Sequence, residues 1–180
     1  MGSITTIMFM SVSSADISLP ISDWTKDNHN IWKLFEDARN GKMKNLIYDF
    51  YGKHGRHLYD ILQVKDQYHL SSLDFMSLDI LEDEIGTALV GIELIRAIRS
   101  LTIIIDELLH AVVPLSCLSN ERKINELKMQ KAFNNSEVYN NVDLDYSEEE
   151  GLFIILKSLL SVMTDALTNN KVFIYIQFTV

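Results

Sequence analysis

The chain has 180 residues, of which 47% are hydrophobic and 23% charged, so it can form a domain with a substantial core. Its formal net charge is −9, which disfavours binding to the phosphates of nucleic acids and suits association with a basic protein. Two prolines and seven glycines leave little material for a flexible linker, so we predict a single domain over residues 1–180.

The first elements in the chain are predicted from apolar spacing. Residues 4–12 are β-branched and apolar, which predicts a first strand buried on both faces. Residues 28–39 carry apolar side chains at helical spacing, and the Asn40-Gly41 pair after them is typical of a helix end. Residues 46–51 are compatible with a helix or a strand, and Leu58, Ile61 and Leu62 predict one or two helical turns after Gly55.

The middle of the chain is predicted to be mainly helical. Residues 68–83 combine turn residues with isolated apolar anchors, which indicates an ordered loop. Residues 88–113 have a helical apolar pattern that ends before Pro114. A further helix begins after a cap at Ser119 or Asn120. Its predicted inner side consists of Ile124, Leu127 and Ala132.

The last third has the strongest pattern. Ser147 followed by Glu150 is a capping box, in which a serine caps a helix and a glutamate follows three residues later. The apolar face of the helix that follows comprises Leu152, Ile155, Leu156, Leu159, Leu160, Met163, Ala166 and Leu167. Residues 171–180 have high β propensity and apolar side chains on both faces, which predicts an interior strand. We therefore expect an α+β fold, in which a small sheet containing the N- and C-terminal strands packs against several helices.

Residues 1–20 lack the basic start and long apolar run of a signal peptide, and no apolar run reaches the roughly 18 residues of a membrane span. The single cysteine, Cys117, excludes an internal disulfide and is compatible with a reducing compartment. These features predict a soluble, cytoplasmic protein without membrane contact.

The stretch YGKHGRHLYD, residues 51–60, is the first place to look for catalytic chemistry. His54 and His57 are three residues apart, but the glycines beside them argue against the helix that would align them. We expect a solvated turn that leads into a helix at Leu58. If the region forms a cleft instead, the candidate catalytic residues are Asp49, Lys53, His54, His57 and Asp60.

Sequence motifs for metals and cofactors are missing from the chain. The histidines do not form HExxH or another strong metal-ligand spacing. The chain also lacks the phosphate loop, the dinucleotide-binding glycine motif and the nucleophile elbow. We therefore expect neither a cofactor nor a metal.

An acidic run precedes the last helix. The simplest explanation is that these acidic residues cap the helix and interact with the positive end of its dipole. The alternative is an acidic patch that binds a basic protein partner. The candidate partner-binding residues are Asp143, Asp145, Glu148 and Glu149.

Residues 137–142 (EVYNNV), the acidic helix start, the Leu-rich helix and the closing strand over residues 172–176 together resemble the end of the YfbM-like family, a bacterial domain of unknown function. Residues 8–17 and 86–88 are similar to the opening and the middle of that family. Asn140 stands in place of the family's proline, and around Lys53 the family's aspartate, tryptophan and histidine are not in place. The resemblance implies a one-domain α+β fold and brings no established activity.

Three functions follow from these patterns. The favoured one is a non-catalytic protein-binding module, for example an immunity or inhibitor protein for a basic partner, because the chain is acidic and lacks catalytic motifs. The alternative is an enzyme of unknown reaction with a site around residues 49–60. The third is a homo-oligomer that pairs through its terminal strand, if that strand lies at a sheet edge.

Overall fold

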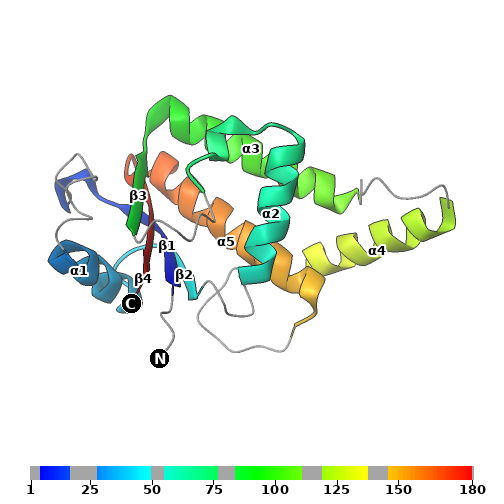
Figure 1. Ribbon diagram of the computed structural model, residues 1–180, viewed down its shortest axis with the longest axis horizontal. Coiled ribbons are helices and arrows are strands. Elements are labelled where there is room, and N and C mark those ends of the chain that lie inside the picture. The colour runs from blue at the N-terminus through cyan, green and yellow to red at the C-terminus, as the bar shows by residue number, and fades with distance from the viewer. Residues whose placement is uncertain are drawn as a thin grey trace.

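The computed structural model describes residues 5–16, 28–49, 55–76, 84–110, 119–137 and 146–179 (Figure 1). Within these ranges the strands are β1 (Thr5–Val12), β2 (Asn45–Asp49), β3 (Glu84–Leu89) and β4 (Val172–Thr179). The α-helices are α1 (Asn28–Arg39), α2 (Gly55–Gln67), α3 (Gly91–Leu109), α4 (Ser119–Asn135) and α5 (Glu148–Thr168). Two short 3-10 helices, η1 (Ser14–Asp16) and η3 (Ser71–Leu73), complete the described elements. The predicted α+β fold is confirmed.

The described strands form one antiparallel sheet in the order β2-β1-β4-β3. The first and last strands of the chain are therefore its two central strands, and the prediction of an interior terminal strand is confirmed. Since β4 pairs with both β1 and β3, it has no free edge through which to extend the sheet into a second copy. β4 therefore cannot form a homo-oligomer by pairing with the same strand of a second copy.

The two faces of the sheet bury different sets of side chains, as strand alternation requires. Phe9 of β1 and its register partner Tyr175 of β4 face the main core beneath α3 and α5, and their ring centroids are 5.3 Å apart. The alternate residues face α1 and form a smaller core, whose buried members are Met8, Met10, Val12, Leu34, Ala38, Val172, Ile174 and Ile176. The sheet thus lies between α1 on one side and the other helices on the opposite side (Figure 1).

Helix α5 lies at the centre of the main core and packs on β1, β2 and β4. The Ser147 hydroxyl accepts a hydrogen bond from the Glu150 N–H at 3.2 Å, so the predicted serine cap is confirmed. The segment Glu149–Thr168 is long and apolar enough to cross a membrane, but 61% of its most apolar window is buried inside the protein. That burial is what a core helix of a folded domain shows.

Three predictions about the elements were wrong. Helix α2 begins at Gly55 rather than Leu58, because glycine costs little at a helix start and destabilises mainly in a helix interior. Strand β3 was not predicted. Its sequence EIGTAL has weak β propensity, and its pairing with β4 supplies the missing stabilisation. The helix expected from residue 88 consequently begins at Gly91.

Two residues that were predicted to belong to buried helix faces are exposed instead. Leu127 is 67% exposed, because α4 packs through Ala132 together with Met129 and Phe133, which share one face at helical spacing. Leu167, in the last turn of α5, is 39% exposed, whereas Ala166 beside it is buried.

Lys157, in the apolar helix α5, forms hydrogen bonds at the C-terminal end of α4. Lys157 Nζ donates hydrogen bonds to the Phe133 carbonyl at 2.5 Å and to the Ser136 carbonyl at 2.9 Å. The same ammonium lies 4.2 Å from the centroid of the Phe133 ring. Burial lowers the pKa of Lys157, and the Glu137 carboxylate opposes that shift. Lys157 therefore caps the carbonyls at the negative end of α4.

Replacing Lys157 with methionine keeps an apolar stem and removes this cap. We expect the free energy of unfolding to fall by about 1–3 kcal/mol, because two carbonyls lose a charged donor. Urea unfolding followed by circular dichroism measures the change. Lys131→Met, at an exposed position of α4, is the matched control and should leave stability within about 0.5 kcal/mol of wild type. Equal effects of the two variants would contradict the capping role.

Candidate functional site

An open groove of about 370 Å³ lies between α2 and the segment that follows η3. Its apolar surface includes Leu62 and Met76, which are almost completely buried, and the exposed ring of Tyr59. The remaining lining residues are polar: Gln63, Lys65, Asp66 and Asp74. Two carboxylates and one ammonium give the groove a negative formal charge.

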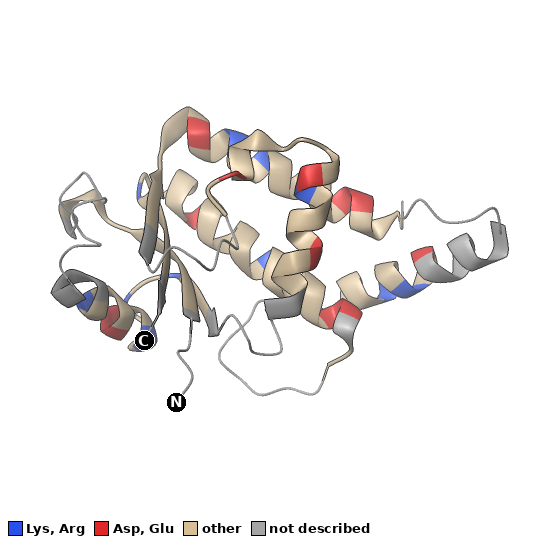
Figure 2. Ribbon diagram, viewed as in Figure 1, with Lys and Arg blue, Asp and Glu red and all other residues tan. Residues whose placement is uncertain are grey.

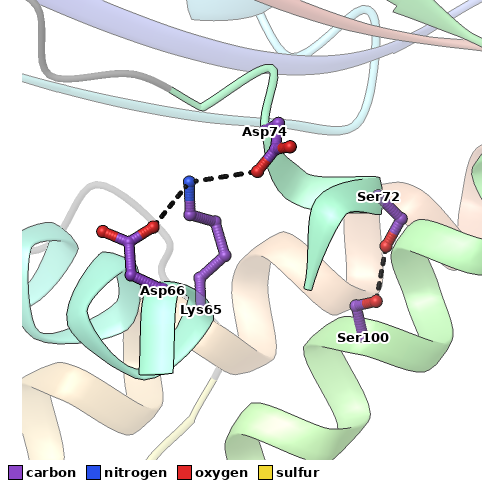
Figure 3. Close-up of polar contacts among 5 residues, drawn as sticks. All are labelled: Lys65, Asp66, Ser72, Asp74 and Ser100. Atoms are coloured by element: carbon purple, nitrogen blue, oxygen red, sulfur yellow. Dashed lines mark hydrogen bonds and ion pairs between the residues drawn. The ribbon is translucent and has the colours of Figure 1, made fainter. Parts of the chain in front are cut away.

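Lys65 connects the two carboxylates, as Figure 3 shows. Its Nζ lies 3.1 Å from Asp66 Oδ1 and 3.4 Å from Asp74 Oδ1. The Lys65 side chain is only 12% exposed, whereas those of Asp66 and Asp74 are 74% and 67% exposed. The ammonium is thus held inside, and the second oxygen of each carboxylate points away from it (Figure 3). The two outer oxygens lie on opposite sides of the ammonium, and both carboxylates are exposed enough to accept hydrogen bonds from another molecule.

The segment that carries Asp74 is fixed to α3. The Ser72 hydroxyl donates to the Arg96 carbonyl at 3.2 Å and forms a short hydrogen bond with the Ser100 hydroxyl (Figure 3). Since Ser72 has a single proton, Ser100 is the donor in the second bond. Leu73, between these polar contacts and Asp74, is completely buried. Asp74 therefore extends from an anchored turn and not from a free loop.

The residues expected to form a catalytic cluster lie in different environments. His57 is buried in the first turns of α2, so the expected solvated turn is wrong for this residue. Asp60, one turn later, is exposed, and Asp49 is the last residue of the sheet-edge strand β2. Lys53 and His54 lie outside the described residues. Neither His57 nor Asp60, the two candidates whose side chains are described, lines the groove.

His57 packs against the start of α5. A Cβ atom at Gly151 would lie 2.6 Å from His57 Nε2 and 2.9 Å from Tyr146 Cε2, both closer than normal contacts. Gly151 therefore permits the close approach of the imidazole and the tyrosine ring to the helix. This environment explains His57 as a packing residue between α2 and α5.

The acidic residues proposed for partner binding are only partly described. Asp143 and Asp145 lie outside the described residues, and Glu148 is the first residue of α5. The Glu149 carboxylate forms an ion pair with Lys128 Nζ of α4 at 2.8 Å. This contact lowers the pKa of Glu149. Glu149 thus joins two helices of the same chain. Among the described residues, no three His, Cys, Asp or Glu side chains gather as a metal site.

The groove residues were not among the predicted site residues, although α2 carries a signal for them. Tyr59, Leu62 and Asp66 follow one another at helical spacing, which places an aromatic, an apolar and an acidic side chain on one face. That signal depends on the helix extending to Gln67, and only one or two turns were predicted. The approach of Asp74 to Lys65 results from the tertiary fold and has no sequence signature.

Comparison with known proteins gives no relative: no family model, no curated protein and no solved structure matches the chain. What the groove can do is therefore decided by its own residues. It offers exposed carboxylate acceptors beside an aromatic ring and an apolar floor, which suits a cation with an apolar stem.

Proposed function

We propose that the protein is a non-catalytic binding module that recognises a basic protein partner. The observation that carries this proposal is the groove, in which an exposed aromatic ring and apolar surface adjoin the outward-facing oxygens of Asp66 and Asp74. The net charge of −9 adds a long-range attraction for basic proteins. Acidic positions also recur on α2, the end of α3 and the start of α5 (Figure 2).

Binding explains the groove better than catalysis does. General acid–base catalysis needs groups that converge on a reacting atom in a site that excludes water. The groove is open, and its two carboxylates are more than half exposed. The buried His57 packs against α5, and the exposed Asp60 does not line the groove. These placements favour the binding module over an enzyme built on residues 49–60.

An acidic module that covers a basic functional surface inhibits the protein that carries it. We therefore include inhibitor or immunity action against a basic partner in the proposal. The relationship to the YfbM-like family also stays a proposal. It is compatible with the α+β fold, but that fold class is shared by many unrelated functions and supplies no activity of its own.

The test is to identify the partner and rebuild the complex. The tagged protein is used to capture its partners from the source cells, each candidate is purified separately, and binding is measured by size-exclusion chromatography with light scattering. We expect a stable complex with a protein whose net charge is positive. Glu36→Gln, an exposed position on α1 across the sheet, should leave the complex intact.

Two outcomes would contradict the proposal. One is that every captured protein fails to form a complex from purified components. The other is that the reconstituted partner is as acidic as this chain, since charge attraction would then be absent.

A further inference from the structure

We draw no further inference here: the strongest candidate, the exposed apolar surface of Val90 and Ile92 where β3 leads into α3, carries no proposal because nothing among the described residues shows what covers it.

Discussion

Replacing Phe153 with alanine is expected to lower the free energy of unfolding by about 3–5 kcal/mol. Phe153 is completely buried in α5, and its ring packs edge-on against Phe133 of α4 with the centroids 5.4 Å apart. The substitution leaves a cavity where the two helices meet and removes an aromatic contact between them. Urea unfolding monitored by circular dichroism measures the loss.

The control for this variant is Leu127→Ala, an apolar residue of α4 that is 67% exposed. It should change stability by no more than about 0.5 kcal/mol. If Phe153→Ala were as mild as Leu127→Ala, α5 would not be the centre of the core.

Replacing Gly151 with valine is expected to cost about 2–3 kcal/mol of stability. Any side chain here meets His57 and Tyr146, because even a Cβ atom would lie 2.6 Å from His57 Nε2. Gly151→Ala introduces the same Cβ, but the higher helix propensity of alanine offsets about 1 kcal/mol of the cost. The expected order of stability is therefore glycine, alanine, valine, measured by thermal and urea unfolding.

A double-mutant cycle tests the cause of this cost. Removing the imidazole with His57→Ala opens space beside Gly151, so Gly151→Ala should be less destabilising in that background by about 1 kcal/mol. A penalty for Gly151→Ala that is unchanged by His57→Ala would mean that the two residues do not meet.

Much of the fold is predictable because the patterns are local. The limits of α1, the serine cap of α5 and the long apolar faces of the two central strands follow from spacing, capping chemistry and β propensity. Strand β3 is not predictable in this way, since EIGTAL becomes a strand only by pairing with β4. The same limit applies to α4, where the residues that face α5 depend on how the helix is rotated in its final packing.

The groove was harder to predict than the fold, because it depends on a contact between separate elements. Asp66 comes from α2, and Asp74 reaches the same ammonium only because Ser72 and Leu73 fix the turn before it. In contrast, the dense polar stretch over residues 51–60 attracted attention by composition. Of the candidate residues described there, His57 is used for packing and Asp60 is exposed to solvent, whereas Tyr59, which was not a candidate, lines the groove. A high density of polar residues in the sequence therefore does not predict that their side chains form a common site in the fold.

The central claim is that the protein binds a basic partner through charge. Isothermal titration of the purified partner at about 50 mM and about 500 mM sodium chloride tests it most directly, because salt screens attraction between exposed charges. The account predicts that the dissociation constant rises at least about tenfold at the higher salt concentration. A dissociation constant that is the same at both salt concentrations would contradict it.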